Sequence, residues 1–351
     1  MESSKTIFDF KVSKAAFWLL LLVLLTVILK TLSFLFIPLI FAILACYAMG
    51  IPFDFLKKLK IPGSLRILII TAIVLAVIFV LGKLVTHNVK QFQIQLPLYE
   101  AKFWDYAGKI LIYFDISEEQ GKEMIDAFFS NLKQKKFASL GGMVQNLGSS
   151  FFSFIGNLMW VLVFMIFILA EREAFTRRLI KKLGKQKAAP VLETMARVNQ
   201  SVQQYLGLKT LISLLTGLVV VVILTLLGVD FALLWGTLVF ILNFIPTIGS
   251  IVATVPPIAI TFFQFGSIGK TIVVAILLIA TQLIVGNILE PKIMGRGLKL
   301  SPMVVLLSLI FWGWIWGIPG MLLSVPLTAA IRIGMEQLDS TRTIAELISS
   351  D

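Results

Sequence analysis

The sequence predicts an all-α polytopic membrane protein. Hydrophobic residues make up 58% of the chain and charged residues only 14%, and the mean hydropathy is +0.96. A soluble globule would need far more polar surface. Two charge-free runs, 231–269 and 300–331, are each broken near the middle by an Ile-Pro pair with a glycine close behind. Broken helices at membrane depth are typical of chains that surround a cavity or a site.

The N-terminal unit, residues 1–86, is expected to cross the membrane three times. Residues 15–56 would span about twice the hydrocarbon thickness as one straight helix, so we expect a hairpin that turns near residues 30–33. Residues 65–86 then lead out of the membrane. The lysines of the first 14 residues place the N-terminus in the cytoplasm by the positive-inside rule.

Residues 87–148 are expected to form a small extracytoplasmic helical segment. Residues 88–148 carry seven lysines and seven acidic residues. A capping box, Ser117 to Gln120, predicts a helix start. The aromatic residues of the segment either line an entrance or pack its helices together and rest on the lipid headgroups.

Residues 149–209 predict one span followed by a basic cytoplasmic amphipathic helix. Nine basic residues face three acidic ones between Glu171 and Lys209, which marks this segment as cytoplasmic. Because topology already explains the net charge of +12, nucleic acid is not expected as a partner.

Residues 210–335 are interpreted as the core, with a cytoplasmic tail at 336–351. Residues 210–229 and 271–289 predict full spans. The arms of the two broken runs are short for a crossing, so we expect two re-entrant hairpins that enter from opposite faces, giving six full spans in all. The alternative is eight or more spans, with the same sidedness.

The hairpin tips supply the first candidate site or hinge residues. The similarity of the two tips suggests weak inverted internal symmetry. The tip residues are Pro246, Thr247, Gly249 and Ser250 in the first run and Pro319 and Gly320 in the second.

Polar residues at helical spacing supply further candidates. Gln282, Gly286 and Glu290 recur every four residues, with Asn287 beside them, so this stripe should face the bundle interior. Pro291 weakens the helix there. The alternative for Glu290 is an interfacial ion pair with Lys292 or Arg296.

A second stripe predicts another polar helix face. Lys209, Ser213, Thr216 and Gly217 lie at helical spacing, although small residues there also permit close helix packing. Asn243 precedes the first tip, where it either binds a polar ligand or satisfies backbone groups freed by the break.

Enzymatic chemistry is not expected. The chain has no phosphate-binding Gly-rich loop, no zinc-protease motif and no nucleophile elbow. With one histidine and one cysteine, a metal centre made by the protein is excluded in practice, and no cofactor is expected. Any transport would be passive or driven by an ion gradient.

Three ordered motifs closely resemble the autoinducer-2 exporter (AI-2E) family of bacterial inner-membrane proteins, and its quorum-signal transport branch in particular. These motifs occupy residues 243–250 with 255–257, residues 286–295, and residues 320–327. The resemblance runs from the first hairpin to Arg332.

The resemblance implies a homo-oligomeric, pentameric transporter without an ATPase that works by an elevator-like movement. It implies export of autoinducer-2, while some relatives resemble sodium(lithium)/proton antiporters. The positions carried over as site or hinge residues are Asn243, Pro246, Gly249, Asn287, Glu290, Pro291 and Gly295.

Three functional hypotheses follow. The first is export of a small polar, autoinducer-2-like metabolite through a site between the hairpin tips and the residue 282–290 stripe. The second is exchange of a cation for a proton, with Glu290 or Asp230 titrating and Lys209 as a further ion-coupling candidate. The third is a membrane scaffold that transports nothing.

Overall fold

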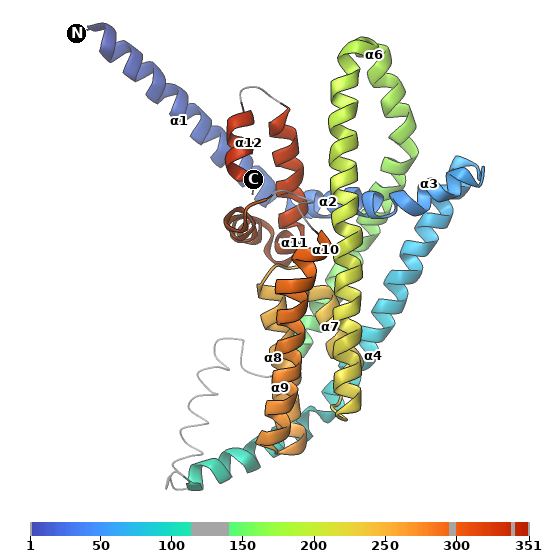
Figure 1. The fold of residues 1–351 in the computed structure, drawn as a ribbon, viewed down its shortest axis with the longest axis vertical. Helices are drawn as coiled ribbons and strands as arrows, with labels where there is room; N and C mark the ends of the chain where they lie inside the picture. Colours follow the sequence, from blue (N-terminus) through green and yellow to red (C-terminus); the bar gives the residue numbers. More distant parts are fainter. Residues whose placement is uncertain (1, 114–139, 295–299, 338–340, 350–351) are drawn as a thin grey trace. The chain divides into compact units, whose positions relative to one another are not determined.

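The structure is a computed structural model that describes residues 2–113, 140–294, 300–337 and 341–349. These parts are helical, apart from loops and an isolated backbone bridge between Leu300 and Ser349. Figure 1 shows the helices in chain order: α1 (Glu2–Thr31), α2 (Ser33–Ala48), α3 (Gly50–Lys58), α4 (Gly63–Tyr113), α6 (Leu140–Leu226), α7 (Ala232–Leu242), α8 (Ile248–Phe265), α9 (Ile268–Leu283), η1 (Ile284–Leu289), α10 (Glu290–Met294), α11 (Pro302–Glu336) and α12 (Arg342–Ile348).

By length and composition alone, five helical stretches of the described residues could cross a membrane, or six when the bent pair of α1 and α2 is counted as one span; α9, η1 and α10 together form one of these stretches, and α11 is another. The prediction of an all-α polytopic membrane protein is therefore confirmed. How many segments cross fully, and from which side the hairpins enter, remain predictions.

The chain forms two compact units. Unit 1 contains residues 1–47, 160–199 and 299–351, and unit 2 contains residues 48–159 and 200–298. The two broken runs belong to different units, so each hairpin is described within its own unit.

In unit 1, the chain turns between α1 and α2 at Leu32, where the sequence predicts a turn. The prediction that the two helices form an antiparallel hairpin is wrong. The two helices meet at 85° and do not run antiparallel. The reason is packing: several apolar residues of α2 pack against a cluster of α11 that includes Trp312 and Trp316. The indole N–H of Trp316 also donates to the backbone oxygen of Leu29, at 2.9 Å, in the last turn of α1.

Also in unit 1, α11 is a helical hairpin and not one continuous crossing. Gly317 interrupts it with φ 64° and ψ −141°, a conformation that glycine adopts readily. The indole N–H of Trp312 donates to Oγ1 of Thr328 at 3.2 Å. In an unbroken helix these residues would lie about 24 Å apart, so the second arm folds back on the first.

The long helix α6 is likewise broken, at Gly184, which has φ 74° and ψ 158°. Figure 1 shows the chain reversing direction at this point, with two helical arms side by side. The turn lies among lysines of the basic segment. It therefore sits in the stretch that the sequence places in the cytoplasm.

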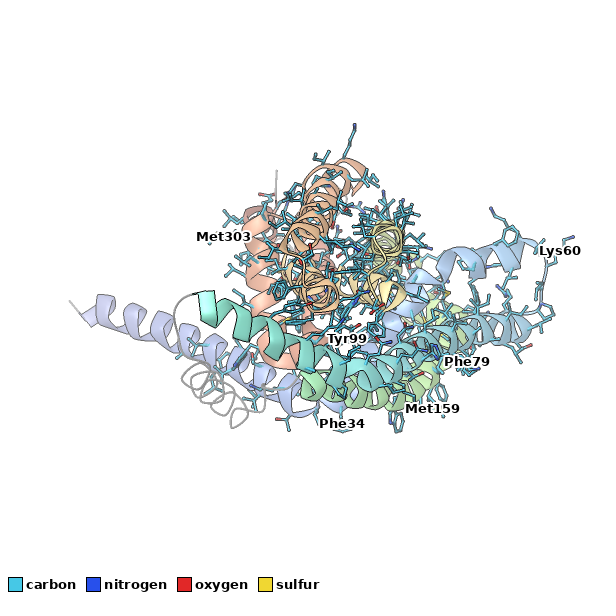
Figure 2. The ribbon with its side chains drawn as sticks, turned by 90° about the horizontal axis from the view of Figure 1, so that it is seen from below. Phe34, Lys60, Phe79, Tyr99, Met159 and Met303 are labelled. Atoms are coloured by element: carbon cyan, nitrogen blue, oxygen red, sulfur yellow. The ribbon has the colours of Figure 1, made fainter. Side chains whose placement is uncertain are left out.

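In unit 2, α4 continues beyond its predicted span to Tyr113. Along α4, Phe79 is exposed, whereas Phe92 and Tyr99 are buried in the core formed with α6 to α9; Figure 2 labels Phe79 and Tyr99. The sequence left two roles open for the aromatic residues of this segment. Phe92 and Tyr99 take the second role, because they pack helices together. The capping box at Ser117 to Gln120 lies outside the described residues.

Tyr99 ties α4 to the loop before α7. Its hydroxyl donates to Oδ2 of Asp230 at 2.6 Å. Burial raises the pKa of Tyr99, and the hydrogen bond to Asp230 and its negative charge raise it further. The hydroxyl therefore stays protonated in the folded protein well above its ordinary range.

Tyr99→Phe is expected to lower the free energy of unfolding by about 1.5–3 kcal/mol, because the hydrogen bond that it removes has a charged acceptor. Since the folded pKa is the higher one, this contribution is complete below the unfolded pKa of about 10 and is lost as the pH rises above it. Thermal unfolding at pH 8 and pH 11 should show the two proteins converging at the higher pH. Equal unfolding temperatures at pH 8 would contradict this.

The first broken run forms a hairpin of α7 and α8, which pack against each other. Helix α7 has only 11 residues and is about 16 Å long, which is about half of the hydrocarbon thickness. Helix α8 has 18 residues. The short first arm agrees with a re-entrant hairpin better than with two full spans.

Helix α9 changes into the π-helix η1 just before Pro291. The backbone N–H of Glu290 donates to the oxygen of Val285, five residues earlier. Pro291 has no N–H and its ring crowds the preceding turn, which accounts for a local change of helix type. Short π segments of this kind are frequent at functional sites.

Candidate functional site

The tip of the first hairpin spans residues 243–247. Pro246 cannot continue the helix, because it lacks an N–H and its ring clashes with the carbonyl four residues earlier, that of Leu242. Thr247 follows with φ 61° and ψ −56°, an uncommon conformation for a β-branched residue. Strained backbone of this kind clusters at binding sites and switch regions.

Gly249 closes this tip. It is buried, and a Cβ built on it would overlap the backbone oxygen of Leu242 and lie 3.3 Å from Cβ of Ile245. Only glycine therefore fits where the start of α8 meets the end of α7.

Gly320 closes the tip of the second hairpin in the same way. A Cβ there would overlap the backbone oxygen of Trp312 and lie 3.0 Å from Cβ of Trp316. Each tip thus places a glycine against a carbonyl of the arm before it. The two tips therefore resemble each other in local geometry as well as in sequence, while the inverted symmetry stays a prediction.

Helix α6 presents its predicted polar stripe to the interior of unit 2. Lys209 is 2% exposed and Ser213 and Thr216 are 0% exposed. The hydroxyl of Thr216 donates to the backbone oxygen of Ile212 at 2.7 Å. A Cβ on Gly217 would lie 2.7 Å from the oxygen of Gly236, so the stripe combines close helix packing with polar contacts.

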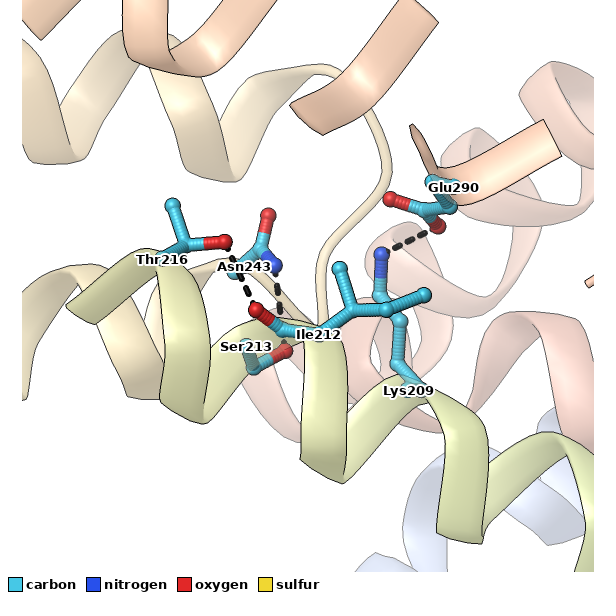
Figure 3. A network of polar contacts seen from close by, with 6 residues as sticks. All are labelled: Lys209, Ile212, Ser213, Thr216, Asn243 and Glu290. Atoms are coloured by element: carbon cyan, nitrogen blue, oxygen red, sulfur yellow. Dashed lines mark hydrogen bonds and ion pairs between the residues drawn. The ribbon is translucent and has the colours of Figure 1, made fainter. Parts of the chain in front are cut away.

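An ion pair joins this stripe to Glu290, the first residue of α10 (Figure 3). Nζ of Lys209 lies 2.5 Å from Oε1 of Glu290, and the two side chains are 3% and 23% exposed. Taking two charges out of water is costly unless they are paired. The alternative that Glu290 pairs with Lys292 does not hold, because Lys292 is exposed and Glu290 bonds to Lys209; Arg296 lies outside the described residues.

Asn243 bonds to the same stripe one helical turn further along. Its side-chain N–H donates to Oγ of Ser213 at 3.1 Å, and its amide oxygen points away from Ser213 (Figure 3). The described contact is therefore with a side chain and not with backbone freed at the tip. The site unites the ion pair with the buried amide within unit 2.

The other predicted site residues differ in their exposure. Gln282 is half-buried, but Gly286 and Asn287 are exposed, so this stripe does not face the interior along its whole length. Pro246, Ser250 and Pro319 are half-buried, Thr247 and Pro291 are exposed, and Gly295 lies outside the described residues.

Asp230 is separate from this centre. The carboxylate of Asp230 accepts from Tyr99. The backbone N–H of Asp230 donates to Oε1 of Gln264 at 2.9 Å, and its backbone oxygen accepts from the indole N–H of Trp235 at 3.1 Å. These contacts hold together the loop before α7 and the end of α8.

Sequence reasoning selected Lys209 and Glu290 separately and missed their pairing. A signal was present, since Asp230 and Glu290 are the only acidic residues between positions 210 and 335. Lys209 directly precedes this stretch, and a buried lysine needs an acidic partner.

Comparisons with known proteins agree with this architecture. The chain matches the AI-2E family transporter model over residues 17–339. It is 35% identical over 300 residues to a Haemophilus influenzae protein named "Putative transport protein", covering 82% of each chain. It is 43% identical over 209 residues to the AI-2 transport protein TqsA of Escherichia coli K12, covering 59% of each. A Bacillus subtilis relative, YueF, is 26% identical over 91% of this chain and 92% of its own.

The family and these relatives are named as transport proteins, and the prediction that the chain is not an enzyme is confirmed. The family match covers the hairpins, the polar stripe of α6 and the ion pair alike. The chain therefore belongs to the AI-2E family of membrane transporters.

Proposed function

We propose that this protein is a secondary transporter of the bacterial inner membrane that exports a small polar metabolite of the autoinducer-2 type. The observation that carries the proposal is the Lys209–Glu290 ion pair, buried within apolar helices beside the amide of Asn243. Charged groups inside a membrane segment mark substrate or ion pathways. The naming of TqsA as an AI-2 transport protein supports this class of substrate.

The chemistry of the site fits such a molecule. A small polyhydroxylated furanose presents several donors and acceptors. Lys209 supplies a donor, Glu290 an acceptor, and Asn243 has an amide oxygen directed away from Ser213 (Figure 3). The transported molecule would take over part of these contacts during passage.

The proposal also includes the conformational change that carries the substrate across the membrane. The division of the chain into two compact units and the short first arm of the α7–α8 hairpin favour an elevator-type displacement of a hairpin-bearing unit. We further propose that the protein works as a homo-oligomer, a pentamer by family resemblance.

Asn243→Ala is expected to reduce efflux of an autoinducer-2-like sugar from proteoliposomes by about tenfold or more, the effect of one lost hydrogen bond in a buried site. Thr237→Ala is the matched control, because the Thr237 hydroxyl donates within its own helix, in an exposed hydrogen bond to the backbone oxygen of Leu233. Both variants should elute from a sizing column like the parent. Full efflux by Asn243→Ala would exclude this residue from the site.

A second candidate function is exchange of a cation for a proton. It is favoured by the position of Glu290 within an apolar stretch, since acidic residues inside membrane segments mark ion pathways and proton relays. Sodium- or lithium-dependent proton movement in the same vesicles, without sugar, would support it. No such movement from pH 6 to pH 9 would reject it.

A further inference from the structure

Unit 1 contains a cavity of about 610 Å³ that the proposed transport site does not use. Helix α2 lines it with Leu39 and Ile43, and the two arms of α6 line it with residues such as Ile168 and Ala196. Its volume is in the range of pockets that bind small molecules, about 300–1,000 Å³. Most of the side chains that line the cavity are apolar.

One side of the cavity is charged. Arg172 lines it just after the charge-free stretch 149–170 ends. Among the described side chains, no carboxylate pairs with the Arg172 guanidinium. Glu171 also lines the cavity, but its carboxylate lies 3.9 Å from the guanidinium of Arg178, which offsets its charge.

This combination has the chemistry of a lipid site. An apolar chamber lies next to an arginine at the point where the predicted span meets the basic segment. Arginine binds phosphate oxygens through paired N–H groups. Basic pockets between helices on the cytoplasmic side of a membrane attract anionic headgroups, and residues 171–209 carry nine basic residues against three acidic ones.

We propose that this cavity binds an anionic phospholipid of the surrounding bilayer. One of its two acyl chains lies along Leu39, Ile43 and Ile168, and its phosphate binds Arg172. The proposal is independent of the transport function, because none of these residues belongs to the Lys209–Glu290 site.

The test uses the full-length protein in detergent with phosphatidylglycerol or phosphatidylcholine of the same acyl chains, and measures retained lipid by native mass spectrometry. Arg172→Gln should weaken phosphatidylglycerol binding about tenfold or more, the effect of losing a charge-assisted contact. Lys181→Gln is the matched control, since it removes the same charge from the same segment but does not line the cavity. It should bind like the parent.

Ala196→Phe provides a second, independent arm, because it narrows the cavity without changing its charge. It should reduce phosphatidylglycerol retention while the oligomeric mass stays unchanged. Equal binding of both lipids by the parent protein, or parental binding by Arg172→Gln, would overturn the proposal. An altered oligomeric mass with lipid binding intact in Ala196→Phe would show instead that a second copy of the chain covers the cavity.

Discussion

Lys209→Met is expected to destabilise the protein by about 3–5 kcal/mol, because it leaves the Glu290 carboxylate without its partner inside an apolar region. Glu290 keeps 23% of its side chain exposed, which places the expected loss toward the lower end. Denaturant unfolding of the purified protein measures it. Glu290→Leu should have a larger effect, since it strands the ammonium of Lys209, whose side chain is only 3% exposed.

The double variant Lys209→Met/Glu290→Leu should recover most of this stability. Apolar residues of similar volume commonly replace a buried ion pair at no cost to stability. If the pair is present for transport and not for folding, the double variant folds like the parent. A double variant as unstable as the sum of its single variants would show that the two side chains do not interact.

Gly249→Ala and Gly320→Ala are expected to destabilise the two hairpins by about 1–3 kcal/mol each, the usual effect of overpacking. In both cases the added methyl group overlaps a backbone oxygen, of Leu242 or of Trp312. A backbone oxygen cannot rotate away as a side chain can, so the tip itself must open. Thermal unfolding of each variant provides the measurement.

Gly207→Ala and Gly334→Ala are the matched controls for units 2 and 1. Both glycines are helical, and nothing lies within 4 Å of a Cβ added to either. Alanine should stabilise these positions slightly, because its helix propensity exceeds that of glycine by about 1 kcal/mol. If all four variants unfolded at the same temperature, the contact of the tip glycines with backbone oxygens would not account for the stability of the hairpins.

Composition and proline positions were sufficient to predict much of this fold. Charge-free runs of membrane length predict helices directly, and Pro246 predicts a break because its ring excludes the preceding helical turn. The break at Gly317 follows in the same way from the Ile318-Pro319 pair beside it, whereas the turn at Leu32 follows from the length of residues 15–56, which is too great for one span.

Features that depend on tertiary packing were not predictable. The 85° angle between α1 and α2 results from contacts with the tryptophans of α11, which are distant in sequence. The π segment before Pro291 also shifts the helix register, so equal spacing of Gln282, Gly286 and Glu290 does not give them equal burial.

The site itself was predicted in its parts. Lys209, Asn243 and Glu290 stand out because polar groups are costly in hydrocarbon. Their partners were not evident, since the ion pair joins residues 81 positions apart and the amide contact joins residues 30 positions apart. Helical spacing shows which residues share a face but not which faces meet.

Sugar efflux from proteoliposomes that contain either the parent protein or the Lys209→Met/Glu290→Leu variant tests the central claim most directly. The account predicts saturable efflux of an autoinducer-2-like furanose through the parent and the background rate of empty vesicles through the correctly folded double variant. Efflux at the parental rate through the double variant would contradict it.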